Sequence, residues 1–335
     1  MNILLTGGAG YIGSHTALSL IDNGHSVTVI DNLITGSKTI IPSEAKHYNF
    51  DIADESSIKK ILKENKFDIA MHFAGLTRVD ESVKYPEKYE FHNFEKSKIF
   101  FSSCIKNNLK KIIFSSSAGV YGNSNSNNLT EDSELKPINP YADSKYKIEN
   151  YLIEISKKEK VDYTILRYFN VAGADKSKRS GLIARSSTNL IKVICEVATK
   201  KREKIIINGD DYETKDGTAV RDFIHVTDIA DMHVLAADNL LKKTSSNIFN
   251  CGYGSGYSVK EVITEMEKII KNKLQVEIGP RRPNDIAVSI ANSDKFKKEF
   301  NWKPRFNNLN IILSSALNWE RNNSWILKYC KLYQD

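Results

Sequence analysis

A tyrosine and a lysine four residues apart, Tyr141 and Lys145, have a spacing that suits proton transfer. Pro140 comes directly before them and is typical of a helix start, so both side chains are expected on one helix face. A phenol with a pKa of about 10 is a poor base at neutral pH, but a neighbouring ammonium favours the phenolate. Such a tyrosine could take a proton from a hydroxyl group while hydride leaves the same carbon. Taken alone, the pair is more often an exposed surface contact.

Three serines, Ser115–Ser117, lie upstream of this pair and directly follow the apolar run Ile112–Phe114. The run predicts a buried parallel strand, and open α/β folds bind ligands at the carboxyl ends of such strands. A serine hydroxyl both donates and accepts hydrogen bonds, so Ser117 is expected to hold the reacting oxygen and relay its proton to Tyr141. A serine cluster by itself would indicate a turn, but its place before Tyr141 and Lys145 favours the catalytic interpretation.

A glycine-rich turn opens the chain, where the strand-like run Ile3–Thr6 leads into Gly7, Gly10 and Gly13. This GxxGxxG spacing, followed by a helical pattern, is a variant of the Rossmann dinucleotide fingerprint. Glycines let the backbone approach a pyrophosphate, which the free N–H groups of the helix start can bind. The turn residues expected to contact a cofactor are Gly7, Gly10, Tyr11, Ile12 and Gly13.

Acidic residues stand at the ends of the next two strand-like runs. The run Ser26–Ile30 ends in Asp31, with Asn32 beside it. An acidic side chain there accepts hydrogen bonds from ribose hydroxyls and repels a 2′-phosphate, which favours NAD over NADP. The alternative is that Asp31 is a turn or cap residue. Asp51 and Ile52, after the third run, are expected to contact the adenine ring.

The elements that must position these residues alternate regularly in the first half of the chain. Strand-like runs are Ile3–Thr6, Ser26–Ile30, His47–Phe50, Ile69–Phe73, Lys111–Ser115 and Tyr163–Leu166. Helix-like segments between them are Tyr11–Asn23, Ser56–Asn65, Pro86–Asn107 and Tyr141–Lys158. This alternation predicts an α/β fold, with a Rossmann-like, doubly wound parallel sheet and helices on both faces. We assign residues 1–168 to this NAD-binding domain.

The second half has a looser pattern and predicts a smaller C-terminal α/β lobe, residues 169–335, that binds the substrate. Asn170–Asn189 is loop-like, and a short strand is expected at Lys204–Asn208. Predicted helices are Leu190–Lys200, Thr227–Leu241, Val259–Lys271, Ser293–Phe300 and Asn308–Asn322. No Pro/Ser-rich linker separates the halves, so the lobe is expected to pack against the sheet, with some segments returning to it.

The composition is that of an ordinary globular protein, with 41% hydrophobic and 27% charged residues among 335. No stretch approaches the roughly 20 apolar residues that span a bilayer, and the N-terminus lacks the features of a signal peptide. The net charge of +7 suits an anionic ligand but does not indicate nucleic-acid binding. The four scattered cysteines form no CxxC pair, which argues against disulfides and a metal site and favours a reducing, cytoplasmic compartment.

Several long motifs, taken in order, resemble the extended short-chain dehydrogenase/reductase family, and within it the UDP-hexose 4-epimerases. The motifs are Thr6–His15, His72–Leu76, Ser115–Gly122, Arg167–Asn170, Asp216–Val226 and Pro280–Arg282. The resemblance, which continues to about Trp319, implies that Tyr141, with Ser117 and Lys145, deprotonates the sugar O4 while tightly bound NAD takes hydride from C4. The 4-keto sugar would then turn over and receive hydride on its other face.

The same resemblance implies two sets of binding residues and a homodimer. For NAD they are Phe73, Ala74, Gly75, Asn93, Ser115, Tyr141, Lys145 and Tyr168, beside the residues named above. For the UDP-hexose they are Ser117, Tyr141, Phe169, Asn170, Asn189, Leu190, Ile206, Asn208, Arg221, Phe223, Val259, Arg282, Asp285 and Ser289. Arginines suit phosphates because their planar fork stays charged. The alternative for Arg221 and Arg282 is a surface ion pair.

The sequence departs from the family pattern at several of these positions. Thr77, followed by Arg78, stands where the family often has Lys. Lys96 replaces a usual Gly, which puts local helix packing in doubt, and Asn208 replaces an aromatic residue on the uracil side. Arg78 could substitute for the missing Lys, the Lys96 departure does not put the reaction in doubt, and contacts to the base are expected to differ at Asn208.

A further departure concerns the sugar. Ser289 stands where a bulky Tyr is common in the family, so we expect room for an N-acetyl group. Turnover of UDP-N-acetylhexosamines as well as plain UDP-hexoses would follow. The alternative is that a neighbour, Val288 or Ile290, fills the gap.

Other activities remain open at this point. A sugar-nucleotide 4,6-dehydratase would carry an Asp-Glu pair just after the central serine, where this chain has Ala118 and Gly119. A net dehydrogenase would exchange its NAD freely. An NAD-binding regulator without activity is disfavoured by the intact set of Ser117, Tyr141 and Lys145. An assay with UDP-sugars and no added NAD separates these alternatives.

Overall fold

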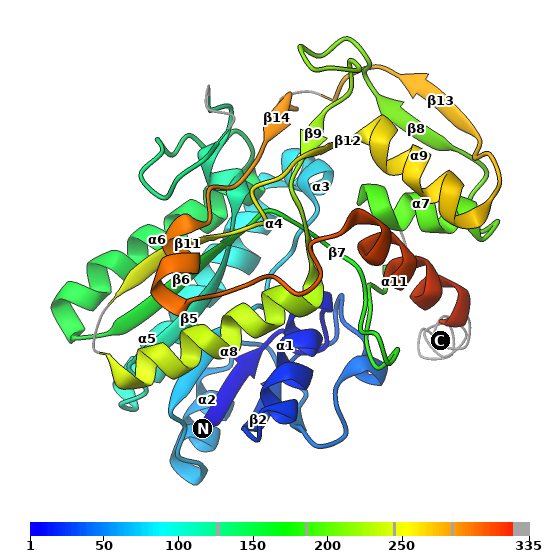
Figure 1. The fold of residues 1–335 in the computed structure, drawn as a ribbon. Helices are drawn as coiled ribbons and strands as arrows, with labels where there is room; N and C mark the ends of the chain where they lie inside the picture. The colour runs from blue at the N-terminus through cyan, green and yellow to red at the C-terminus, as the bar shows by residue number, and fades with distance from the viewer. Residues whose placement is uncertain (125–127, 185–186, 244–245, 283–284, 324–335) are drawn as a thin grey trace.

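A parallel sheet of seven strands forms the centre of the molecule (Figure 1). The computed structural model describes residues 1–124, 128–184, 187–243, 246–282 and 285–323. In spatial order the strands are β11 (Asn247–Cys251), β6 (Asp162–Tyr168), β5 (Lys111–Ser117), β4 (Ile69–His72), β1 (Asn2–Thr6), β2 (Ser26–Ile30) and β3 (Lys46–Tyr48). The strand order reverses between β1 and β4, as predicted for a doubly wound sheet. In such sheets this switch point is where ligands bind.

Helices cover both faces of the sheet because side chains alternate along each strand. Ile3 and Leu5 of β1 pack into the core cluster that includes helices α1 (Tyr11–Asp22) and α8 (Val226–Lys242). Leu4 points to the opposite face, where the second core cluster lies. That face is covered by α2 (Glu55–Glu64), α5 (Lys96–Lys106) and α6 (Pro140–Glu159). Burial on both faces explains why these strands are almost continuously apolar.

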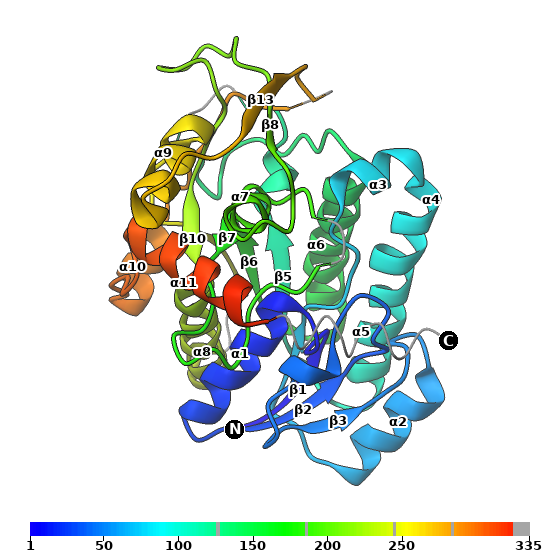
Figure 2. The ribbon, with the colours of Figure 1, turned by 90° about the vertical axis from the view of Figure 1, so that its right-hand side faces the viewer.

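The smaller lobe lies beyond one end of the sheet, at the top of both views (Figures 1 and 2). Its short strands are β7 (Asn170–Ala172), β8 (Ile205–Asn208), β9 (Val220–Arg221), β10 (Phe223–His225), β12 (Tyr257–Ser258), β13 (Val276–Gly279) and β14 (Val288–Ser289). They form the sets β10-β7, β12-β9-β14 and β13-β8. Its helices are α7 (Leu190–Ala198), α9 (Val259–Ile270) and α11 (Leu309–Asn322), whereas α10 (Asp294–Phe300) packs against strand β11 of the large sheet.

Two segments of the C-terminal half belong to the large sheet. Strand β11 pairs in parallel with β6, from Asn247 opposite Thr164 to Cys251 opposite Tyr168. Helix α8 lies along α1 on one sheet face (Figure 1). The seventh strand therefore comes from beyond residue 168, and the chain returns to the sheet after building part of the lobe.

Two predicted segments differ from the structure. The predicted loop Asn170–Asn189 begins with strand β7, which pairs with β10 in the lobe. The predicted single helix Pro86–Asn107 is divided into α4 (Pro86–Tyr89), a π-helical stretch (Glu90–Glu95) and α5. An apolar periodicity does not reveal an extra residue in one turn, and π-helical turns often occur at functional sites.

Three cysteines, Cys104, Cys195 and Cys251, are buried free thiols, and Cys330 lies outside the described residues. Burial raises the pKa of each thiol. Within the described ranges, no helix is both long enough and apolar enough to cross a membrane.

A buried ion pair lies between the large sheet and α6. The guanidinium of Arg167 on β6 bonds the carboxylate of Glu149 on α6, with Nη2 2.7 Å from Oε2. Their side chains are only 2% and 1% exposed. Ser116 donates to the same carboxylate, and Arg167 also donates to the Tyr121 hydroxyl at 2.9 Å. The pair thereby joins β5, β6 and α6 below the carboxyl ends of the strands.

We expect Glu149→Ala to lower the free energy of unfolding by about 3–5 kcal/mol, because it leaves a buried guanidinium without its counter-charge. Urea denaturation followed by circular dichroism measures this change. Glu154→Ala, on an exposed position of the same helix, is the matched control and should change stability by less than about 0.5 kcal/mol. Equal stabilities of the two variants would contradict the importance of the buried pair.

Candidate active site

The glycine turn between β1 and α1 brings backbone atoms closer together than any side chain would permit. Gly7 has a φ of +74°, and a Cβ there would lie 2.6 Å from the backbone nitrogen of Ala74. A Cβ on Gly13 would lie 2.3 Å from the carbonyl oxygen of Gly7. The N-cap of α1 is Gly10, which has no side chain to cover the first N–H groups of the helix, at Tyr11 and Ile12. The turn therefore fits a diphosphate, which these N–H groups can bind.

A pocket extends from this turn along the carboxyl ends of β1, β2, β3 and β4. Its lining includes most of the predicted cofactor residues: Gly7, Gly10, Asp31, Asn32, Asp51, Ile52, Phe73, Ala74 and Gly75. His92 and Lys96 complete one wall. The pocket lies at the switch point of the sheet, where the strand order predicts a dinucleotide.

Asp31 fulfils the role of a turn residue and also lies in this pocket. Its Oδ2 accepts a hydrogen bond from the backbone N–H of Ala9 at 2.9 Å, and its Oδ1 accepts one from Leu33 at 2.8 Å. Burial raises the pKa of the carboxyl, and the two backbone bonds lower it. The two interpretations of Asp31 are thus compatible: it shapes the glycine turn and offers oxygen atoms to the pocket.

Asn93 holds the segment that follows β4 in place. Its Oδ1 accepts from the backbone N–H of Leu76 at 2.7 Å, and its Nδ2 donates to the Leu76 carbonyl at 3.0 Å. Nδ2 also reaches the hydroxyl of Ser144 on α6 at 3.1 Å. Asn93 is buried, and it links the pocket wall at Gly75 to the helix that carries Tyr141. Its contacts in this structure support the backbone around the pocket.

The predicted catalytic residues lie together where β5 ends and α6 begins. Asn139 caps α6 by accepting from the backbone N–H of Ala142 at 2.9 Å, which fixes Tyr141 in the first helical turn. The ammonium of Lys145 donates to the carbonyl of Ser115 at 2.8 Å. Ser117 accepts from the backbone N–H of Gly119 at 3.1 Å.

Burial and hydrogen bonding set the electrostatics of the catalytic residues. Burial raises the pKa of Tyr141, and a hydrogen bond with Ser117 lowers it. Burial also lowers the pKa of Lys145 to about 8, while the charge of Glu149 raises it. The ammonium of Lys145 is directed to the Ser115 carbonyl, and the hydrogen bond that lowers the pKa of Tyr141 comes from Ser117.

Some of the residues predicted to bind a sugar nucleotide lie on or next to β9 and β14 in the lobe. Arg221 donates to Asp285, with Nη2 2.6 Å from Oδ1, and burial lowers the pKa of the guanidinium. Ser289 is paired with Arg221 across the two strands, so both side chains leave the strands on the same side. Ser289 is 6% exposed. The side-chain amide of Asn208 is oriented with its oxygen toward Arg282, and this oxygen accepts a hydrogen bond from the guanidinium Nη2 at 3.1 Å.

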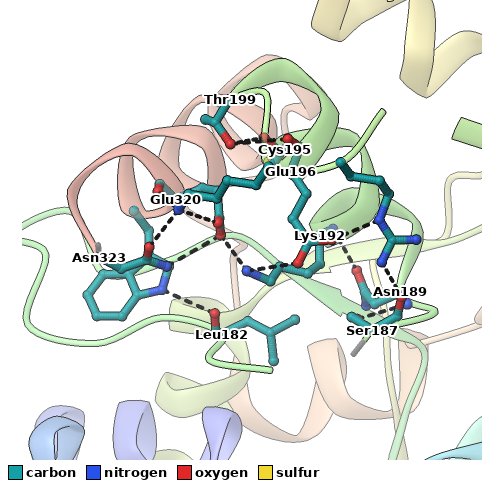
Figure 3. Close-up of polar contacts among 12 residues, drawn as sticks. Leu182, Ser187, Asn189, Lys192, Cys195, Glu196, Thr199, Glu320 and Asn323 are labelled. Carbon is teal, nitrogen blue, oxygen red and sulfur yellow. Dashed lines mark hydrogen bonds and ion pairs between the residues drawn. The ribbon is translucent and has the colours of Figure 1, made fainter. Parts of the chain in front are cut away.

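Asn189 and Leu190 start helix α7, which an ion-pair network fixes to α11 (Figure 3). Asn189 caps the helix by accepting from the backbone N–H of Lys192 at 3.1 Å. The buried ammonium of Lys192 lies 2.5 Å from Glu320 and 3.3 Å from Glu196. Because Glu320 belongs to α11, the C-terminal helix holds the segment that carries Asn189.

The remaining predicted residues are spread over the core, the short strands and the surface. Phe169 and Phe223 are buried in core clusters. The hydroxyl of Tyr168 forms a hydrogen bond with Nε2 of His233 at 2.5 Å. Asn170 donates its backbone N–H to Asp222 at 2.9 Å, and Val259 donates to Ala219 at 3.2 Å. Ile206 is exposed on β8, the strand that ends at Asn208. Arg78 pairs with Asp80 at 2.5 Å near the surface.

Sequence reasoning missed Tyr212 and the pocket residues His92 and Lys96. The hydroxyl of Tyr212 donates to the Asn208 carbonyl at 3.3 Å, and its ring lies 4.1 Å from the Arg281 guanidinium carbon. A spacing signal existed for Lys96, because it follows Asn93 by three residues and such residues share a helix face. No comparable signal marks Tyr212, which lies in an irregular loop.

The chain is similar over nearly its whole length to epimerases. The model of the NAD dependent epimerase/dehydratase family matches residues 3–252. A UDP-glucose 4-epimerase from Azospirillum brasilense is 39% identical, covering 96% of this chain and 92% of that protein.

Solved structures agree with this assignment. The UDP-glucose 4-epimerase from Bifidobacterium longum in complex with NAD+ and UDP has a TM-score of 0.92 and 37% identity, covering 96% of this chain and 99% of that chain. The UDP-Glc/GlcNAc 4-epimerase from Campylobacter jejuni has a TM-score of 0.83 and 42% identity, covering 96% of this chain and 99% of that chain. The family model and these near-complete similarities, together with the glycine turn and the dinucleotide pocket, show that the chain belongs to the NAD dependent epimerase/dehydratase family.

Proposed function

We propose that this protein is a UDP-hexose 4-epimerase that inverts C4 of its sugar through a transient 4-keto intermediate. The observation that carries the proposal is the meeting of Ser117, Tyr141 and Lys145 at the end of β5, beside a pocket that fits a dinucleotide. The names of the similar proteins point to the same reaction. We assign the large sheet to cofactor binding and the smaller lobe to the UDP-sugar.

Proton transfer in this mechanism belongs to Tyr141. Its phenolate takes the proton of the sugar O4 and later returns it, so no net proton is consumed. Ser117 holds O4 and supports the phenolate through its hydrogen bond to Tyr141. Lys145 adds positive charge to the site, and Glu149 helps to keep it protonated. Bound NAD supplies the hydride acceptor for the first half of the reaction and the donor for the second.

The lobe supplies the groups that hold the diphosphate and the base. Arg221 and Arg282 come from different segments, and Asp285 holds the guanidinium of Arg221. Guanidinium groups of this kind can bind two phosphate oxygens at once. The sugar is held by its distant nucleotide, so the 4-keto ring is free to turn over near Tyr141. Such anchoring explains how hydride can leave one face of the ring and return to the other.

A 4,6-dehydratase is the second candidate, but no observation favours it. The residues after Ser117 are Ala118 and Gly119, which carry no carboxylate for chemistry at C5 and C6. A net dehydrogenase would require exchangeable NAD.

We further propose a homodimer, which light scattering of the purified protein would test.

Purified protein is expected to carry NAD through gel filtration, because the enzyme must regenerate the cofactor in place. The glycine turn and Asp31 supply the contacts that retain it. Chromatography of the nucleotide released by denaturation identifies it, and an assay with UDP-galactose and no added NAD tests the reaction. Release of NADP, or an absolute requirement for added NAD, would count against the proposal.

A further inference from the structure

Lys96 lies in the dinucleotide pocket, although no part of the mechanism above uses it. It begins α5, directly after the π-helical stretch Glu90–Glu95. Its side chain is only 11% exposed, and its ammonium lies 2.6 Å from Oδ2 of Asp51. A buried ammonium is costly unless it is paired, and the carboxylate of Asp51 provides the pairing. The pair joins α5 to the loop after β3 across the pocket wall.

The Asp51–Lys96 pair presents both a donor and an acceptor to the pocket. Asp51 already accepts from the backbone N–H of Ala53 and from Asn32, each at 2.9 Å, which fixes its carboxylate in position. A lysine ammonium has three N–H groups. Among the described residues, Asp51 is its one hydrogen-bond partner. Donor capacity therefore remains on Lys96, next to the oxygen atoms of Asp51.

The edge of an adenine base has the complementary pattern. Its exocyclic amine donates hydrogen bonds, and the ring nitrogens on either side of that amine accept them. Asp51 and Ile52 lie in the pocket on the side of β2 and β3, beyond Asp31. An adenine that extends from the ribose near Asp31 would therefore meet Asp51 and Lys96.

We propose that Lys96 is a cofactor-binding residue that, together with Asp51, recognises the adenine edge of NAD. The carboxylate of Asp51 accepts from the exocyclic amine, and the ammonium of Lys96 donates to a neighbouring ring nitrogen. The proposal rests on dinucleotide binding in this pocket but not on which sugar is epimerised. It gives Lys96 a role in base selection beyond packing of the helix.

Nicotinamide hypoxanthine dinucleotide tests the proposal because its base has the opposite pattern at this edge, with an oxygen acceptor beside an N–H donor. Purified holoenzyme is incubated to equilibrium with equal concentrations of NAD and this analogue, and then passed through gel filtration. Chromatography of the released nucleotides gives the ratio of the two that were bound. We expect the wild type to prefer NAD by about 5- to 150-fold, as found for a well-placed pair of base contacts.

Lys96→Met is expected to lower that preference at least about fivefold, because it removes the donor and keeps the apolar stem. Lys96→Gln keeps one uncharged N–H donor and is expected to retain more of the preference than Met. Should Lys96→Met fail to fold, the Gln variant carries the test. Lys98→Met, on the same helix but paired with Glu95 near the surface, is the matched control and should keep the wild-type ratio.

An unchanged ratio in folded Lys96→Met or Lys96→Gln would overturn the proposal. A lysine that only packs the helix would give this result, because its loss would weaken binding of NAD and of the analogue equally. A wild type that carries no dinucleotide at all would instead contradict the proposed function. The ratio is measured without a sugar nucleotide, so failure of the epimerase assay leaves this test intact.

Discussion

Tyr141→Phe is expected to lose about 10²- to 10⁴-fold in kcat, because the change removes the group that accepts and returns the O4 proton. Only one oxygen atom is lost, and the Asn139 cap that starts α6 does not involve the phenol. The fold and the NAD content should therefore remain. A coupled assay of UDP-galactose turnover, with circular dichroism and nucleotide analysis of the same sample, measures all three properties.

Tyr146→Phe is the matched control for this change. Tyr146 lies on the same helix, and its half-buried ring packs beside a separate small apolar cluster. Loss of its hydroxyl should leave turnover within about twofold of the wild type, since no proton-transfer step depends on it. Near wild-type turnover in Tyr141→Phe would eliminate Tyr141 as the general base. Loss of bound NAD in that variant would show that its main role is to hold the cofactor.

The second large effect concerns the sugar. We expect the wild type to interconvert UDP-N-acetylglucosamine and UDP-N-acetylgalactosamine, because Ser289 is small and shares a side of the sheet with Arg221. Ser289→Tyr should abolish this reaction and spare UDP-glucose and UDP-galactose. Overlap of the tyrosine ring with the N-acetyl group is expected to cost about 3 kcal/mol or more, which lowers kcat/KM for the N-acetyl sugars at least about 150-fold. The measurement is kcat/KM for both sugar pairs.

Ser289→Ala keeps the side chain small and serves as the control, so it should retain both reactions. A wild type that does not turn over UDP-N-acetylglucosamine would leave only the narrower glucose and galactose activity. Equal losses for both sugar pairs in Ser289→Tyr would show that the tyrosine disturbs the lobe in general.

The large sheet could be predicted because each of its elements carries a strong local pattern. The strand β2 has the predicted bounds, α1 ends one residue earlier than predicted, and α6 extends one residue further at each end. These segments are buried on both faces or amphipathic, so their sequences follow the period of the element. The order of strands and helices then left the doubly wound arrangement as the natural fold.

The lobe was less predictable because its strands are short and pair with distant segments. Strands β9, β12 and β14 have two residues each, which is too few to show a periodic pattern. Strand β11 gains its place only by pairing with β6, a contact that local sequence does not contain. The position of such strands follows from tertiary packing, which overrides local propensity.

The candidate site was predictable where motif and element coincide. The glycine turn, the end of β5 and the start of α6 each bring named residues to the same edge of the sheet. Lys96 was assigned only to helix packing, because its partner Asp51 lies on another segment. The direction of the Lys145 ammonium toward the Ser115 carbonyl also required the structure, since spacing alone places the side chain on a face and not against an atom.

The return of the chain to the large sheet also constrains how the protein is made. Strand β11 pairs with the outer edge of β6, and helix α8 covers apolar surface next to α1. Both elements are synthesised after the first six strands of the sheet. At about 5–20 residues per second, a ribosome needs several seconds or more to extend the chain from β6 to β11. During that interval the nascent chain exposes an unpaired strand edge and apolar surface, the features that chaperones bind and that promote aggregation. The large sheet can therefore be completed only after a segment encoded well downstream has been synthesised.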